Sequence, residues 1–270
     1  MASQKATASV ITLTFGDVAE NAHTMQKIGS MAERGITVDE LIDIYVALQA
    51  DGSTKEVELH ELTYLGKDGE KSDGEGREEA VVLVVRGFFD PGRLLDEQLP
   101  LNPDKQCLMR GEVKNRQARW NLCFSDTAQE AKVEEGLGTI IPFSQLPCLA
   151  AVRENLGELS EKLKNLKCEG NYYYDTSKCY IGWHGDAERR VVAGLRLGPY
   201  IDGQPTKDSF PLHFRWYQNS EKISDVYTIE LRHGDMYIMS EKAVGTDWHT
   251  RKTPTLRHSA GYKIPEKKDK

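Results

Sequence analysis

The sequence predicts an α+β fold built on a β-sandwich or jelly roll, and three observations carry this prediction. They are an apolar run at 80–86, a helical pattern of apolar residues over 148–166, and a series of short strands from residue 172 onward. From residue 172 onward, aromatic and β-branched stretches alternate with Gly, Pro and Asp: YYYD, CYIGW, RVVAGLRLG, LHFRWY, VYTIEL, MYIM and LRHSAGY. Short strands separated by turn residues in this way are typical of sandwiches and barrels.

The elements before these strands predict one more strand and two helices. Residues 80–86 (AVVLVVR) form an apolar run typical of a buried strand, and residues 88–92 predict a turn into a short helix. A stronger helix is predicted over 148–166, where apolar residues recur at spacings of three and four: Leu149, Val152, Leu156, Leu159, Leu163 and Leu166. We expect this helix to lie across a sheet.

The first 75 residues predict a separate N-terminal part. Residues 17–50 predict two helices, the first ending at Gly35 and the second opening with a Thr37-x-x-Glu40 capping box. Residues 66–79 are charged and glycine-rich without an apolar anchor, which indicates a loop or linker. We therefore expect a helical extension with an acidic linker over 1–75, the main domain over 76–264 and a short tail over 265–270.

Composition limits the classes of protein that the chain can belong to. The 270 residues carry a formal net charge of −7, which argues against coating nucleic acid through a general basic field and leaves only a local basic surface. Five cysteines without a C-x-x-C pair predict neither a disulfide framework nor a thiolate zinc site. Because no 18-residue apolar run and no secretion signal occurs, we expect a soluble intracellular protein, cytoplasmic or nuclear, with no membrane partner.

The tetrapeptide Trp-His-Gly-Asp at 183–186 predicts a metal site together with His249 and Arg257. Two neutral imidazoles and one carboxylate form the facial triad that holds non-haem Fe(II) and leaves coordination positions open. Side chains two residues apart on a strand project to the same side, so His184 and Asp186 would face one site. An arginine beyond the distal histidine suits a dicarboxylic co-substrate. The planar guanidinium can bind the far carboxylate of such a molecule with two parallel hydrogen bonds.

A second His-Gly-Asp tripeptide at 233–235 is interpreted as structural. A glycine and an aspartate directly before the apolar MYIM segment predict a turn into a strand, with Asp235 bound to backbone amides. His-x-Asp alone is weak evidence of a metal, and the first copy gains its weight from the residues that follow it. Trp183 and Trp248 each directly precede a predicted ligand, so we expect them to wall the metal site.

Five segments together resemble the AlkB-like family of Fe(II)/2-oxoglutarate dioxygenases. They are NYYYD at 171–175, IGWHGDAER at 181–189, LRHGDMYIM at 231–239, DWH at 247–249 and RHSAGYK at 257–263. The resemblance covers residues 170–263 strongly and residues 80–170 only in architecture. It implies a double-stranded β-helix core, with iron held by His184, Asp186 and His249.

The resemblance also implies that Asn171, Tyr173 and Arg257 contact 2-oxoglutarate. Two departures from the family pattern bear on these roles. The segment after Asn171 is one residue longer than in the family, so the three tyrosines at 172–174 compete for the tyrosine role. The family's second arginine is Lys263 here, and a lysine cannot reproduce the two-bond fork.

The resemblance implies oxidation of a modified base in nucleic acid, with Fe(II), 2-oxoglutarate and O2, by hydroxylation or demethylation. A local surface of cations and aromatic rings would contact phosphates and stack bases, with a flipped base beside the iron. The candidates are Arg110, Lys114, Arg116, Arg119, Trp120, Trp183, Arg189 and Arg190. An oxygenase of a protein side chain or small metabolite, which the acidic charge favours, and a non-catalytic binding module stay open as alternatives.

Overall fold

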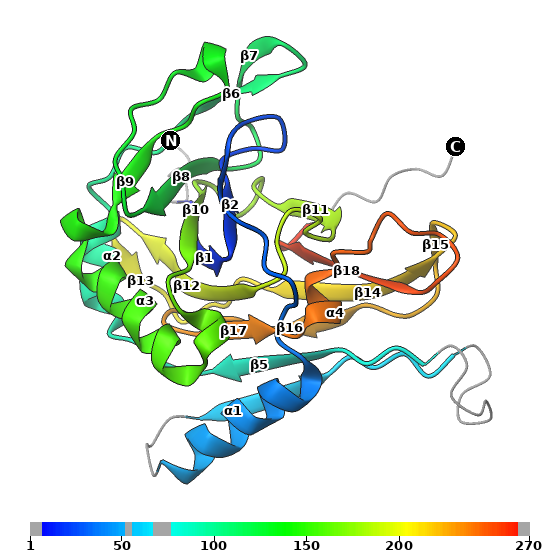
Figure 1. The fold of residues 1–270 in the computed structure, drawn as a ribbon. Helices are drawn as coiled ribbons and strands as arrows, with labels where there is room; N and C mark the ends of the chain where they lie inside the picture. The colour runs from blue at the N-terminus through cyan, green and yellow to red at the C-terminus, as the bar shows by residue number, and fades with distance from the viewer. Residues whose placement is uncertain (1–6, 52–55, 67–76, 264–270) are drawn as a thin grey trace, which may run out of the picture.

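Two β-sheets make up most of the molecule and lie against each other (Figure 1). The computed structural model describes residues 7–51, 56–66 and 77–263. Over these residues the larger sheet has nine strands. Its order is β4 (Val57–Glu61), β5 (Val81–Val85), β17 (Met236–Met239), β12 (Val192–Ile201), β1 (Ser9–Gly16), β10 (Lys167–Tyr173), β8 (Trp120–Ser125) and β9 (Ile140–Pro142), with β13 (Gln204–Pro205) beside β12. The β8–β9 pair is parallel and the other pairs are antiparallel.

The smaller sheet faces the middle of the larger one. Its order is β11 (Ile181–His184), β18 (Thr255–Ala260), β14 (Leu212–Gln218) and β15 (Glu221–Lys222), with β16 (Tyr227–Ile229) also paired to β14. Two hairpins stand outside both sheets: β2 (Val18–Glu20) with β3 (Lys27–Gly29), and β6 (Gln106–Met109) with β7 (Glu112–Asn115). The strand segments predicted from residue 172 onward are confirmed, and the architecture is that of a mostly β protein with curled sheets.

Alternation along residues 11–15 of β1 gives this part of the strand one apolar side and one polar side. Ile11, Leu13 and Phe15 belong to the main hydrophobic core, whereas Thr12 and Thr14 line a cavity on the opposite side of the strand. Successive side chains of a strand point to opposite faces, so one strand serves both. The core lies between this sheet and the helices, while the cavity lies toward the smaller sheet.

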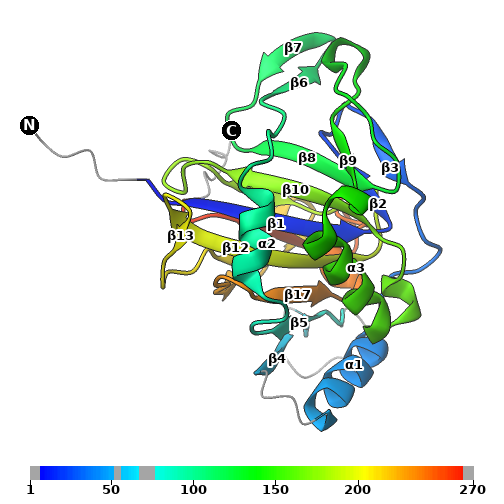
Figure 2. The same cartoon turned by 90° about the vertical axis from the view of Figure 1, so that its left-hand side faces the viewer.

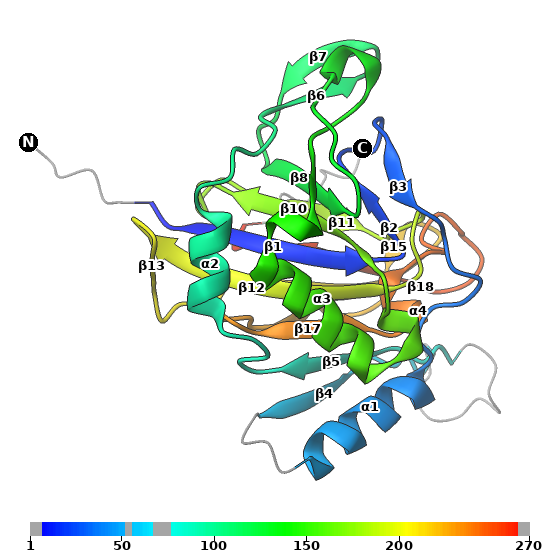
Figure 3. The same cartoon turned by 60° about the vertical axis from the view of Figure 1, so that its left-hand side comes forward.

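Two helices cross the core face of the larger sheet, as Figures 2 and 3 show. Helix α2 (Pro91–Gln98) begins at the N-cap Asp90, and α3 (Pro147–Leu159) begins where the Glu97 carboxylate accepts hydrogen bonds from two backbone amides at 2.7 and 2.9 Å. The prediction of a helix lying across a sheet is confirmed, but its end at residue 166 is wrong. Ser160 is extended, with φ of −164°, and a short 3-10 turn, η3 (Glu161–Leu163), follows.

The N-terminal part differs most from the prediction. Helix α1 (Val38–Ala50) has the expected capping box, with Glu40 N donating to the Thr37 hydroxyl and Thr37 N donating to the Glu40 carboxylate. The helix expected before Gly35 is wrong, because the segment forms β2 and β3. The predicted boundary at residue 75 is also corrected, since β1 lies inside the sheet between β10 and β12.

The remaining elements are short and lie around the sheets. They are η1 (Val133–Glu135), η2 (Phe143–Gln145) and α4 (Glu241–Val244), and α4 lies between β17 and β18 in the sequence. The apolar run at 80–86 forms β5, as predicted. The predicted tail and most of the predicted loop at 66–79 lie outside the described residues. No helix in the described ranges is long and apolar enough to cross a membrane.

Candidate metal centre

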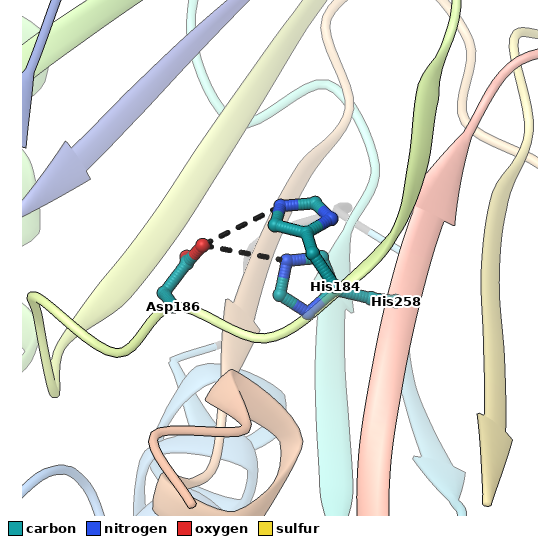
Figure 4. A group of neighbouring side chains, drawn as sticks. All are labelled: His184, Asp186 and His258. Atoms are coloured by element: carbon teal, nitrogen blue, oxygen red, sulfur yellow. Dashed lines mark ion pairs between the residues drawn. The ribbon is translucent and has the colours of Figure 1, made fainter. Parts of the chain in front are cut away.

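Three side chains converge at one end of the smaller sheet (Figure 4). His184, Asp186 and His258 bring one ligand atom each to within 4.8 Å of the others. The Asp186 Oδ1 atom lies 3.5 Å from His184 Nε2 and 3.8 Å from His258 Nε2. This group could hold a metal ion, because two imidazoles and a carboxylate on one side of an ion form a 2-His-1-carboxylate site.

Strand pairing and one obligatory glycine position these ligands. His184 ends β11 and pairs directly with His258 of β18. A Cβ atom at Gly185 would lie 2.1 Å from the Gly245 carbonyl oxygen, so no larger residue fits between the ligands. The backbone amide of Asp186 donates to Val244 O at 3.0 Å, and His184 Nδ1 lies 2.7 Å from Gly182 O. That second contact leaves Nε2 of His184 facing the other two ligands.

The charges of the group suit a divalent cation. Burial lowers the pKa of His258 to about 3, with the neighbouring His184 acting in the same direction. Burial opposes the ionisation of Asp186, but Arg189 and the two histidines outweigh it and hold the pKa of Asp186 below its ordinary value. At neutral pH the group therefore offers a neutral His258 imidazole and an ionised carboxylate, which are the forms that bind metal.

The third histidine of the group is His258, and the predicted His249 is corrected. His249 lies in the segment between α4 and β18, with its ring centroid 3.9 Å from that of Trp248, and it lines the cavity without joining the group. His258 lies on β18 between the buried Leu256 and Ala260. Apolar residues two positions before and two positions after a histidine on a strand indicate that its side chain points inward. The prediction of His249 does not use this signal.

Arg257 and Lys263 lie outside the cavity, contrary to their predicted role beside the metal. Arg257 neighbours His258 on β18 and therefore faces the other way. Its guanidinium lies 4.3 Å from the ring centroid of Tyr217 and 5.3 Å from that of Trp248. Lys263 is exposed beyond the end of β18.

A cavity of about 580 Å³ opens between the two sheets around the three ligands. Asn171 and Tyr173 of β10 line it, as do Trp183 and Trp248. The three tyrosines that compete for the predicted tyrosine role point in different directions. Tyr172 donates to Gln98 Oε1 on the helix side at 3.0 Å and Tyr174 donates to Gln117 O at 2.6 Å, so Tyr173 alone of the three lines the cavity.

Two buried arginines also line this cavity. Arg189 was predicted to contact nucleic acid, but it lies 2.8 Å from Glu169, 3.0 Å from Glu188 and 3.8 Å from Asp186. Its role is therefore internal, beside a metal ligand. Arg196 of β12 was not predicted at all, and it donates a hydrogen bond to the Thr12 hydroxyl. A lone arginine in a strand carries no sequence signal of burial.

The other predicted substrate contacts differ in their surroundings. Arg110 is exposed at the turn between β6 and β7, whereas Arg116 donates to the side chain and carbonyl of Asn21. Arg119 donates to the Asn171 side chain at the cavity. Trp120 stacks on Tyr174 with ring centroids 4.5 Å apart. Lys114 lies on the same β6–β7 hairpin as Arg110 and pairs with Glu112, and Arg190 donates to Glu33 O.

The second His-Gly-Asp tripeptide has the structural role that was predicted. Asp235 accepts a hydrogen bond from the backbone amide of Arg232 at 2.8 Å, and Gly234 has a φ of +91°. His233 Nδ1 accepts a hydrogen bond from Gly198 N at 2.9 Å. The tripeptide therefore forms the turn into β17.

Comparison with known proteins gives one relative that covers almost the whole chain. No family model matches the sequence. The chain is 38% identical over 255 residues to a protein of Acanthamoeba polyphaga mimivirus that is described as "Uncharacterized protein R156". The match covers 93% of this chain and 95% of the viral protein. At that identity and coverage, the chain belongs to the same protein family as the mimivirus protein.

Proposed function

We propose that the chain is an Fe(II)/2-oxoglutarate-dependent dioxygenase with an AlkB-like double-stranded β-helix core. The observation that carries the proposal is the convergence of His184, Asp186 and His258 at a cavity between two sheets. The sequence resemblance supports it through the motif at 183–186 and through Asn171 and Tyr173. In this proposal the two facing sheets are the halves of the jelly roll.

The donor set fits Fe(II). Two histidine nitrogens and one carboxylate oxygen are the ligands of the facial triad, and no cysteine is among them. When bound, iron would supply the oxidation of an unactivated C–H bond by O2, coupled to decarboxylation of 2-oxoglutarate. The chain's own residues hold the ligands in place and leave the side of the group toward the cavity free for both substrates.

Neighbouring residues orient the group and limit access of water to it. Arg189 lies 3.8 Å from Asp186 and is itself fixed by two glutamates, so it holds the carboxylate in one position. Trp183 and Trp248 form an apolar part of the cavity wall next to the ligands. An apolar wall beside the reacting atoms excludes water that would compete with the substrate.

For the oxidised substrate we propose a modified base in nucleic acid, as the resemblance implies. The aromatic wall and the volume of the cavity support a planar group entering beside the metal. A second candidate is a protein side chain or small metabolite. It is favoured by the net charge of −7 and by the internal bonds of Arg116 and Arg189, two residues expected to meet phosphates.

Metal binding and succinate formation test the proposal. With Fe(II), O2 and 2-oxoglutarate, the purified chain should form succinate, and methylated oligonucleotides should accelerate this. His258→Ala should abolish both metal binding and succinate formation, whereas His249→Ala should still bind metal. If His258→Ala binds Fe(II) or Mn(II) as tightly as the original chain, or if no succinate forms with nucleic-acid, peptide or metabolite substrates, the proposal is wrong.

A further inference from the structure

Arg196 is a buried cation on the wall of the cavity without a matching anion. Its side chain is 1% exposed, yet the cavity contains it. One guanidinium nitrogen donates to the Thr12 hydroxyl, the Nε atom has no hydrogen-bond partner, and the guanidinium carbon lies 4.9 Å from the Phe210 ring centroid. No carboxylate of the described residues lies within 4.0 Å of it.

An isolated buried charge is costly, and folded proteins normally pair it. Burial lowers the pKa of Arg196, which reflects this cost. Arginine nevertheless stays protonated in proteins, because its ordinary pKa is above 12. The positive charge therefore persists, and an anion from outside the chain would supply the missing partner.

The surroundings of Arg196 add neutral hydrogen-bond donors. The phenols of Tyr173 and Tyr237 both line the cavity, and burial raises the pKa of each. They therefore remain protonated and able to donate to an anion. The Thr12 hydroxyl completes the set, because it already contacts the guanidinium. A guanidinium with hydroxyl donors is the chemistry that binds a carboxylate.

Tyr237 connects this end of the cavity to the metal group. It pairs with Gly194, two residues from Arg196 or about 7 Å along the strand, and the charge of Asp186 acts on its phenol. A ligand that starts at the metal group and passes Tyr237 therefore leads to Arg196 within the same cavity. A dicarboxylic acid has one carboxylate for each of these two positions.

We propose that Arg196 binds the distal carboxylate of the dicarboxylic co-substrate, in the role that the sequence motif suggested for Arg257. The inference rests on the proposed function, since it takes the other end of the co-substrate to be at the metal. Arg119 is the competing cation of the cavity, but it already donates to the Asn171 side chain and is only partly buried. Arg257 faces away from the cavity.

A thermodynamic cycle with two keto acids tests the assignment. The protein is loaded with Mn(II), which does not start the reaction, and titrated with 2-oxoglutarate and with 2-oxobutyrate, which lacks only the distal carboxylate. The original chain should bind 2-oxoglutarate at least about 30-fold more tightly, as expected for a buried charge pair. Arg196→Met should remove that preference and leave the affinity for 2-oxobutyrate unchanged.

Matched variants separate Arg196 from the other cations. Arg257→Met and Arg119→Met should keep the preference for 2-oxoglutarate, and Arg196→Lys should keep a reduced one, because it retains the charge without the fork. Mn(II) affinity measured on each variant shows that the fold and the metal group are intact. If Arg196→Met or Arg196→Lys retains the full preference, or if the original chain binds both keto acids with equal affinity, the assignment is wrong.

The two proposals fail in different ways. If Arg257→Met or Arg119→Met abolishes the preference while Arg196→Met does not, the dioxygenase proposal stands and Arg196 is not the anchor. If 2-oxoglutarate does not bind but succinate or glutarate raises the melting temperature of the original chain and not of Arg196→Met, the anchor stands and the dioxygenase proposal falls.

Discussion

Arg189 and Arg196 line the same cavity and are almost equally buried, at 4% and 1% exposure, but their partners differ. Arg189 lies within 4.0 Å of three carboxylates, whereas Arg196 contacts a hydroxyl and an aromatic ring. A buried cation surrounded by anions belongs to the architecture of a site. A buried cation without one indicates where a charged ligand binds, so Arg189 belongs to the metal end of the cavity and Arg196 to its anion-binding end.

Strand register keeps the two ends apart. Gly16 of β1 pairs with Val192 at the start of β12, close to Arg189, whose Cδ atom lies 3.3 Å from where a Gly16 Cβ would be. Thr12 pairs with Arg196. The offset of four residues between these pairs corresponds to about 13 Å along the strand. The Thr12–Arg196 contact and the Arg189 network therefore lie at different positions along β1.

The same substitution at the two arginines should have opposite effects on stability. Arg189→Met leaves Glu169 and Glu188 buried without their cation and should lower the free energy of unfolding by about 3–5 kcal/mol. Arg196→Met removes a buried charge that has no carboxylate of the described residues within 4.0 Å and only the more distant charge of Asp235 acting on it, so the ligand-free protein should be equally or more stable. Urea unfolding of metal-free protein measures both. Equal losses at the two positions would contradict the division of the cavity.

The metal end of the cavity should also make stability depend on pH. His258 has a pKa of about 3 in the folded chain against about 6.5 when unfolded, so the unfolded chain binds more protons between these values. Stability is therefore fully present above pH 6.5 and should fall by about 3 kcal/mol on going down to pH 4. Urea titrations of metal-free protein at several pH values measure the slope. His258→Gln should flatten it, and an unchanged slope would count against the burial of a neutral His258.

Gly194 tests the segment between the two ends. A Cβ atom there would lie 2.2 Å from Cζ of Tyr237, so Gly194→Ala should displace this ring, which lines the cavity together with Arg196 and the metal group. We expect a loss of about 1–3 kcal/mol in unfolding free energy, as for other overpacked sites. Gly182→Ala is the matched control, because nothing lies within 4 Å of its Cβ position. Similar stabilities of the two variants would show that Tyr237 moves freely.

Strands and motifs of the C-terminal half are predictable because their periodicity is local. β12, β14, β17 and β18 follow from apolar and β-branched runs between turn residues, and His184 with Asp186 follows from a spacing of two. The predicted helical extension over 1–75 does not include β1. Ile11-Thr12-Leu13-Thr14-Phe15 nevertheless alternates with period two, which is the local pattern of a strand.

The rest of the site depends on contacts between distant segments. The pairing of β18 with β11 places His258, and not His249, beside His184. The sequence alone does not distinguish these two histidines, because either one could serve as a metal ligand. Arg196 has no distinguishing neighbour in the sequence. Its significance comes from burial without an anion, which only the packing of β1, β10 and β12 produces.

The position of β1 also affects how the chain folds. Thr12 and Arg196 bond to each other across 184 residues of sequence, and both hydrogen-bonding edges of β1 are filled by strands that are synthesised much later. Until β10 and β12 exist, the segment exposes two unpaired edges, which is a hazard for aggregation. Pairing over such distances is slow, because the loop must close before any contact forms. The apolar core and the cavity should therefore appear together, in one late step of folding.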